Sequence, residues 1–398
     1  MSGYQIIDSY KEQIIESMQH MIAIPAISPE SGGEGESKRA DFLGQLLKSM
    51  GFEIRRFDYI DGHNVCRSSV VCCFGNAPRT LWVIAHIDTV SAGDINLWKY
   101  DPFKGTLIDD RIFGRGTNDD GQDVIAGIYA LKALKESNVK LKYNYGLALV
   151  ADEEVGSEFG IEKLINEGIF KKDDMIMVPD SGNAQGSEIE IAEKSMLWLK
   201  ITIRGKQVHA SIPDTGVNAF RYMSEFSLDV YNMLHSKYNK TDNTFIPNAS
   251  TFEMTKHEKN QESINMIPET EIFYIDCRIL PEYKIDDIMS DIRIIAQLEK
   301  YQKVKIDIEP YMRDDAPMAT SESCEIVKLT KEAIKKVINV EPYVTGIGGG
   351  TFARFFRAKG IDAVVWSKKP DIPHIIDEYV IVDDILTDAK VFYEMVVE

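Results

Sequence analysis

Two residues directly behind a predicted strand offer metal-binding chemistry. The apolar run 81–85 is followed by His86 and, two positions later, by Asp88. Because side chains alternate along a strand, both leave the same face, and the carboxylate can orient the imidazole and raise its basicity as a ligand. A single histidine after a strand is more often packed or on the surface. A metal site therefore needs further ligands.

Three acidic motifs and a second histidine supply such ligands. The motifs are GRGTNDD at 114–120, DEEVGS at 152–157 and PDSG at 179–182, and His374 precedes an Asp-Glu-Tyr triplet near the end of the chain. Each acidic motif alone also suits a turn or a helix cap. Together, however, close carboxylates raise one another's pKa unless cations separate them. Imidazole nitrogens with carboxylate oxygens suit zinc, with cobalt or manganese as substitutes.

The acidic motifs accompany the strands of a predicted α/β domain. Up to about residue 190, helical patterns alternate with short apolar runs, which is typical of a mostly parallel sheet with helices on both faces. Strands are predicted at 81–85, 145–151 and 174–178, and a helix at 124–136. Binding groups in such sheets gather beyond the carboxyl ends of the strands. Five ligands with one shared carboxylate then suffice for two metals about 3.5–4 Å apart.

The middle of the chain follows a different plan. Strand, helix, two strands, helix and strand are predicted in this order, which is the ferredoxin-like β-α-β-β-α-β arrangement. We therefore expect a catalytic domain of residues 1–193 and 311–398, interrupted by a compact inserted unit at 194–310. The inserted elements span 196–204, 217–234, 250–256, 271–280, 285–297 and 304–309, and the α/β pattern resumes at 325–337, 346–351, 352–359 and 363–367.

The motif HIDTV at 86–90, the three acidic motifs and the final histidine occur in order over nearly the whole chain. They resemble the two-zinc exopeptidase and deacylase family that contains succinyl-diaminopimelate desuccinylase, acetylornithine deacetylase, aminoacylase and glutamate carboxypeptidase. This resemblance implies two Zn²⁺ ions per subunit, with Co²⁺ or Mn²⁺ as alternatives, and makes Asp119 the ligand that they share. One ion would add His86 and Asp180, and the other Glu154 and His374.

Further roles follow from the same resemblance. Glu153 would be the general base that takes a proton from the attacking water, Asp88 would orient His86, and the peptide bond after Asp119 would be cis. The inserted unit would be a dimerisation domain, and its His209, in the motif GKQVHA, would reach the site of the partner subunit in a homodimer and stabilise the oxyanion. The family positions that hold a substrate carboxylate correspond to Asn265, Arg278, Gly350 and Thr351.

Two departures from the family pattern leave the substrate open. At the position of Asp180 the family has mostly glutamate in deacylases and carboxypeptidases, and mostly aspartate in aminopeptidases and dipeptidases. The usual Lys-Gly after the paired aspartates is Gly121-Gln122 here. The overall match favours cleavage of the amide bond of a small N-acyl amino acid, as by the desuccinylase or the deacetylase. Asp180 favours the alternative, a dipeptidase or carboxypeptidase that uses the same site.

Composition argues against several other classes of protein. The net charge of −18 disfavours nucleic acid or an anionic membrane as partner, and no apolar run reaches membrane-spanning length. Five cysteines without a CxxC pair, in a chain without a signal-peptide pattern, predict reduced thiols in the cytoplasm. The turn at 346–351 begins like a dinucleotide fingerprint but lacks its third glycine. A binding protein without catalysis is the remaining rival, although every expected ligand and the base are present.

Overall fold

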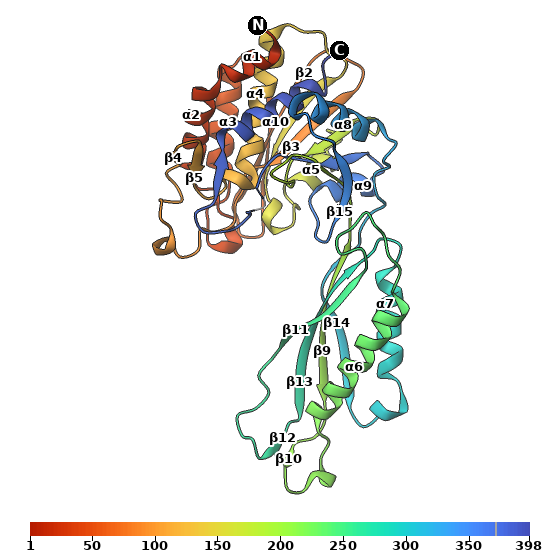
Figure 1. The fold of residues 1–398 in the computed structure, drawn as a ribbon. Helices are drawn as coiled ribbons and strands as arrows, with labels where there is room; N and C mark the ends of the chain where they lie inside the picture. The colour runs from red at the N-terminus through yellow and green to blue at the C-terminus, as the bar shows by residue number, and fades with distance from the viewer. Residues whose placement is uncertain (371) are drawn as a thin grey trace. The chain divides into compact units, whose positions relative to one another are not determined.

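The computed structural model describes residues 1–370 and 372–398, and the chain divides into two compact units (Figure 1). The first contains Met1–Ile191, Thr320–Thr345 and Thr351–Glu398, and the second contains Ala192–Ala319 and Gly346–Gly350. In the described part of the chain, no helix is long and apolar enough to cross a membrane.

The first unit is built on an eight-stranded sheet. Its strands are β1 (Ile54–Ile60), β2 (Cys66–Phe74), β3 (Thr80–His86), β6 (Asn144–Val150), β7 (Met175–Val178), β8 (Glu188–Glu193), β15 (Tyr343–Ile347) and β16 (Ala363–Val365). They lie in the order β1-β2-β6-β3-β7-β16-β8-β15. The centre, from β6 to β16, is parallel, and antiparallel strands flank it. Every residue of β3 is buried, as a central strand covered on both faces requires.

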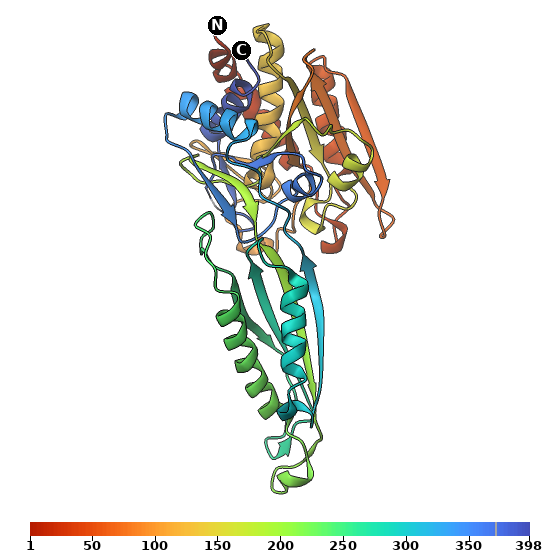
Figure 2. The ribbon, with the colours of Figure 1, turned by 90° about the vertical axis from the view of Figure 1, so that its right-hand side faces the viewer.

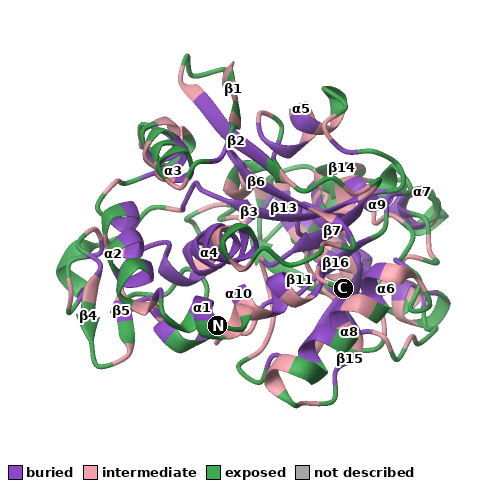
Figure 3. Ribbon diagram, turned by 90° about the horizontal axis from the view of Figure 1, so that it is seen from above, coloured by how far each residue is buried: buried purple, intermediate pink, exposed green. Residues whose placement is uncertain are grey.

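Helices cover both faces of this sheet. Gly127 in α4 (Gln122–Ser137) packs against Val83 and Leu147 on one face. The alternate residues of the same strands, including Trp82 and Ala148, share a core cluster with α5 (Ile161–Asn166) and α9 (Ala353–Ala358) on the other. Figure 3 shows α4 largely buried, and α10 (Val382–Glu394) lies beside it. The predicted α/β fold with helices on both faces is confirmed.

A small three-stranded sheet was not predicted from the sequence, yet it positions the site. It consists of β4 (Thr106–Ile108), β5 (Arg111–Phe113) and β17 (Tyr379–Ile381), in the order β17-β5-β4. Tyr379 pairs with Phe113 in this sheet. Because β5 leads into residues 114–120 and the segment containing His374 leads into β17, the pairing brings these two segments together.

The second unit has the predicted β-α-β-β-α-β order. Its elements are β9 (Ser195–Arg204), α6 (Ala219–Lys237), β11 (Thr251–His257), β13 (Thr270–Ile279), α7 (Ile285–Ala296) and β14 (Lys305–Asp314). The four strands form an antiparallel sheet in the order β11-β13-β9-β14, and α6 and α7 lie side by side on one face of it (Figure 2). Strand β14 runs five residues beyond the predicted end at 309, because a bulge between Pro310 and Met312 lets an edge strand continue past a proline.

Candidate metal centre

The predicted metal ligands lie at one edge of the large sheet, where the parallel strands end. His86 is the last residue of β3, Glu154 follows β6, and Asp180 follows β7. Asp119 lies in the turn that leads into α4, and His374 lies on the segment before β17. Strand polarity alone therefore gathers three of these side chains, and the pairing of β5 with β17 adds the other two.

The five side chains form two groups that share Asp119. His86 Nε2 lies 2.8 Å from Asp119 Oδ1 and 3.6 Å from Asp180 Oδ1. His374 Nε2 lies 3.1 Å from Asp119 Oδ2 and 3.1 Å from Glu154 Oε2. Each oxygen of Asp119 thus faces a different histidine, which is the arrangement a carboxylate needs if it is to serve two ions at once.

The clustered carboxylates favour positive charge on their neighbours at this edge of the sheet. Contacts with Asp119 and Glu154 raise the pKa of His374 to about 10. Burial alone would lower the pKa of His86, but its contacts with Asp119 and Asp180 outweigh burial and raise it well above the ordinary value. A metal can bind an imidazole only in its neutral form, so divalent ions would take the place of these protons. Two imidazoles and three carboxylates fit Zn²⁺, Co²⁺ or Mn²⁺.

Asp88 holds both the first histidine and the loop that carries the two glutamates. Its buried carboxylate accepts hydrogen bonds from the backbone N–H groups of Glu153 (3.0 Å) and Glu154 (3.2 Å). His86 Nδ1 lies 3.1 Å from the backbone oxygen of Asp88 and 3.5 Å from its carboxylate. Asp88 therefore contacts His86 through its main chain as well as its carboxylate, and it holds the loop of Glu153 directly.

Glu153 precedes the predicted ligand Glu154 but belongs to neither group of metal-ligating side chains. Burial and then the negative charge of Asp180 raise its pKa well above the ordinary value. The preceding residue, Asp152, has a left-handed backbone (φ 71°) and is held by Arg67, whose Nη1 lies 2.8 Å from Asp152 Oδ1. A buried ion pair thus anchors the start of the loop that presents the predicted base.

Glu378 holds the backbone around the shared aspartate, a role that sequence reasoning missed. Its carboxylate accepts from the N–H groups of Asn118 (2.8 Å), Asp119 (3.1 Å) and Gly116 (3.1 Å), and from Arg115 Nη1 (2.6 Å). The peptide bond between Asp119 and Asp120 is cis, as the resemblance implies. The only sequence signal for Glu378 is its place four residues after His374.

The other predicted site residues lie mostly in the second unit. His209 is exposed, and its Nδ1 lies 2.7 Å from Ser211 Oγ. The strand of His209 pairs with the strand of Met266. This pairing brings Asn265 close to His209, and the backbone oxygen of Asn265 accepts a hydrogen bond from Ala210 N (2.9 Å).

Arg278 and the glycine-rich turn also come together in the second unit. The Arg278 guanidinium donates to both oxygens of Asp276 and to the backbone oxygen of Gly348 (3.0 Å). Gly350 belongs to this unit as well, whereas Thr351 belongs to the first. The arginine therefore reaches the turn with its orientation fixed by an aspartate.

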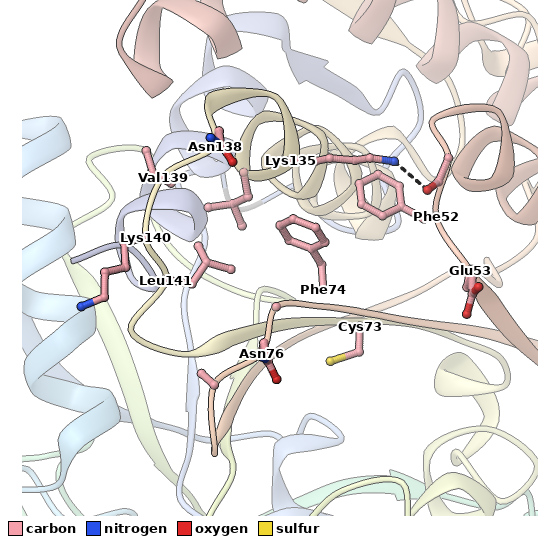
Figure 4. Close-up of a pocket in the computed structure, with 14 residues that line it drawn as sticks. Phe52, Glu53, Cys73, Phe74, Asn76, Lys135, Asn138, Val139, Lys140 and Leu141 are labelled. Atoms are coloured by element: carbon pink, nitrogen blue, oxygen red, sulfur yellow. Dashed lines mark hydrogen bonds between the residues drawn. The ribbon is translucent and has the colours of Figure 1, made fainter.

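A hollow of about 660 Å³ lies in the first unit, away from the ligands (Figure 4). It is lined in part by Phe52, Phe74 and residues 138–141, which precede β6, so it lies at the amino ends of the parallel strands. Lys135 Nζ lies over the Phe52 ring and donates to the backbone oxygens of Met50 (3.0 Å) and Gly51 (2.6 Å). Neither group of candidate metal-ligating side chains borders this hollow, and the predicted metal site lies at the other edge of the sheet.

Fold and site together define a metal-dependent hydrolase, and the comparisons with known proteins agree. The chain belongs to peptidase family M20/M25/M40, whose profile matches residues 82–398. This result confirms the resemblance found in the motifs.

Relatives match nearly the whole length of the chain. It is 36% identical to an uncharacterised metallohydrolase of Methanocaldococcus jannaschii, over 96% of this chain and 98% of that protein. It is 26% identical to a succinyl-diaminopimelate desuccinylase of Orientia tsutsugamushi, over 96% and 95% of the two chains. The crystal structure of aminopeptidase PepT from Bacillus cereus has the same fold, with a TM-score of 0.77 at 19% identity over 97% of this chain and 98% of the other.

Proposed function

We propose that this protein cleaves the amide bond of a small N-acyl amino acid, in the manner of succinyl-diaminopimelate desuccinylase or acetylornithine deacetylase, with two Zn²⁺ ions per subunit. The observation that supports a two-metal centre is the division of Asp119 between two histidine-carboxylate groups, and the desuccinylase relative supports the substrate class. Asp119 with His86 and Asp180 would hold one ion, and Asp119 with Glu154 and His374 the other. Three protein ligands at each ion leave room for water or substrate.

Glu153 is the residue that would move the proton. Two bound ions supply a water of lowered pKa and polarise the substrate carbonyl. Glu153 would take the proton from the attacking water and return it to the leaving amine. Its neighbour Glu154 contacts His374. Glu154 would therefore bind a metal ion, and Glu153 would stay free to act as the base. The backbone N–H groups of both are held by Asp88, which keeps this division in place.

The second unit would supply the groups that recognise the substrate. Arg278 and the backbone of Gly350 would hold the substrate carboxylate, with Asn265 and Thr351 as further polar partners. The fixed orientation of Arg278 by Asp276 supports this role, since a preorganised guanidinium loses less freedom on binding a carboxylate. The protein would act as a homodimer in the cytoplasm, where its free cysteines stay reduced.

His209→Ala is expected to lower kcat by about 10²–10³-fold, because one donor to the developing oxyanion is lost. His235→Ala is the control, since His235 hydrogen-bonds the backbone oxygen of Tyr231 on its own helix and packs against the Phe252 ring. Mixing His209→Ala chains with Glu153→Ala chains tests whether His209 serves the partner subunit. Recovery of activity in the mixture supports the cross-subunit role, and full activity of an isolated monomer contradicts it.

The substrate class is tested by amine release from N-succinyl-diaminopimelate, N-acetylornithine and simple dipeptides, with Zn²⁺ or Co²⁺ bound and with a chelated control. We expect chelator-sensitive release from an acylated amine. The desuccinylase relative favours this outcome, whereas Asp180 and the fold of the PepT aminopeptidase leave peptides as the alternative. Release from dipeptides alone would overturn the deacylase proposal and make Asp180 the diagnostic residue.

A further inference from the structure

A lysine that neither the motifs nor the proposed reaction uses lies directly behind the shared aspartate. Lys369 follows β16 at the same edge of the sheet and is only 3% exposed. Its ammonium group donates to the backbone oxygen of Asn118 (3.2 Å), to Asp120 Oδ1 (3.3 Å) and to Asp123 Oδ2 (3.0 Å). The first two of these partners are the residues on either side of Asp119.

The contacts of Lys369 extend to the first histidine through Asp120. While one oxygen of Asp120 accepts from Lys369, the other accepts from the backbone N–H of His86 (3.2 Å). One ammonium group thus connects the segment of Asp119 with the end of the strand that carries His86. Lys369 therefore links the backbones that carry two of the predicted ligands, Asp119 and His86.

The structure also accounts for the missing lysine after the paired aspartates. At Gly121, where the family usually has lysine, a Cβ atom would lie 2.3 Å from the backbone oxygen of Gly116 and 2.8 Å from Met21 Cε. The N–H of Gly121 donates to the same oxygen (3.1 Å), so the close approach is part of the turn. A side chain at this position would therefore require the turn to shift, and in this structure the cation beside Asp120 is Lys369.

We propose that Lys369 is a positioning residue of the metal centre: by binding Asn118 and Asp120 it holds Asp119 where its two oxygens serve two ions. The proposal rests on the ligand set given under the proposed function, but not on the substrate. It also explains how Asp120 and Asp123 remain buried next to the ligands, because a buried carboxylate is tolerated when it is paired and hydrogen-bonded.

The test measures metal binding without substrate. Each protein is stripped with a chelator and then titrated with Zn²⁺ against a chromophoric competitor. Lys369→Met is expected to bind both ions about 10–100-fold more weakly than the wild type, the usual effect of losing a residue that supports metal ligands. Lys368→Met is the matched control, because Lys368 pairs with Asp384 instead, and its affinities should equal those of the wild type. Wild-type affinities in Lys369→Met would overturn the proposal.

A second variant separates positioning from folding. Lys369→Met leaves buried carboxylates without their cation, which is destabilising, whereas Lys369→Met/Asp123→Asn removes one charge of each sign. This double variant should fold and still bind Zn²⁺ weakly, and its visible absorption with saturating Co²⁺ should differ from that of the wild type. Wild-type affinity and spectrum in the double variant would overturn the proposal. Unfolding of both variants in saturating Zn²⁺ would also overturn it, since Lys369 would then be required for folding rather than for positioning the ligands.

The titration of the wild type keeps this proposal separate from the proposed function. If the wild type fails to bind two ions, the ligand set itself is wrong. If it binds two ions but cleaves only dipeptides, the substrate is wrong, and the comparison of Lys369→Met with Lys368→Met is unaffected.

Discussion

Glu153→Ala is expected to lower turnover by about 10²–10⁴-fold, the contribution of a positioned general base, while both ions stay bound. Both ions should stay bound because Glu153 belongs to neither ligand group. The loop that carries it is held by Asp88 through the backbone N–H of Glu153. The variant is measured for turnover and for Zn²⁺ content on the same preparation. A loss of activity that accompanies full metal content identifies the base.

Glu153→Gln sharpens this experiment, because it keeps the volume and the backbone contacts of the loop and removes only the basic oxygen. Both substitutions should therefore be inactive to a similar degree. The control is Glu162→Gln in α5, a residue outside both ligand groups, which should behave as the wild type. Ready turnover by Glu153→Gln, with two ions bound, would remove Glu153 from the proposed mechanism.

The parts of the site that the sequence predicts are those set by local rules. His86 ends an unbroken buried strand and Asp88 stands two residues later, a spacing from which strand alternation predicts a common face. The motifs of Glu154 and Asp180 follow the two parallel strands on either side of β3, and the carboxyl ends of parallel strands meet at one edge. No tertiary contact has to be known to bring these groups together.

The parts that the sequence does not predict depend on pairings between distant segments. Glu378 and Lys369 reach residues 114–120 because β17 pairs with β5 and because β16 joins the sheet beside β7. In the sequence, Lys369 is one of two adjacent lysines in a loop, which is typical of a solvated surface, and only the fold buries it. Arg67 is missed for the same reason, since its polar strand segment gives no sign of the carboxylates that surround it.

The substrate is unpredicted for a different physical reason. Deacylases and peptidases of this kind break the same type of bond with the same kinds of metal ligand. The metal ligands as a set therefore do not distinguish an acylated amine from a peptide as substrate. The selective groups, among them Arg278 and Asn265, lie in the second unit. The one exception within the centre is Asp180, which is why its replacement belongs with the substrate assays.

Asp119→Ala is expected to abolish the binding of both ions, and with it all measurable turnover, because each of its oxygens serves one ligand group. Asp180→Ala and Glu154→Ala provide the comparison, since each removes a ligand from one group only. Zn²⁺ titration should then give two weakened sites for Asp119→Ala and one for each of the others. Thermal unfolding gives an independent reading, because an ion that binds only the native state stabilises it: the rise in Tm on adding Zn²⁺ should vanish in Asp119→Ala and persist in part in the other two. If Asp119→Ala loses a single ion, the carboxylate is not shared, and the two groups are separate sites rather than one centre.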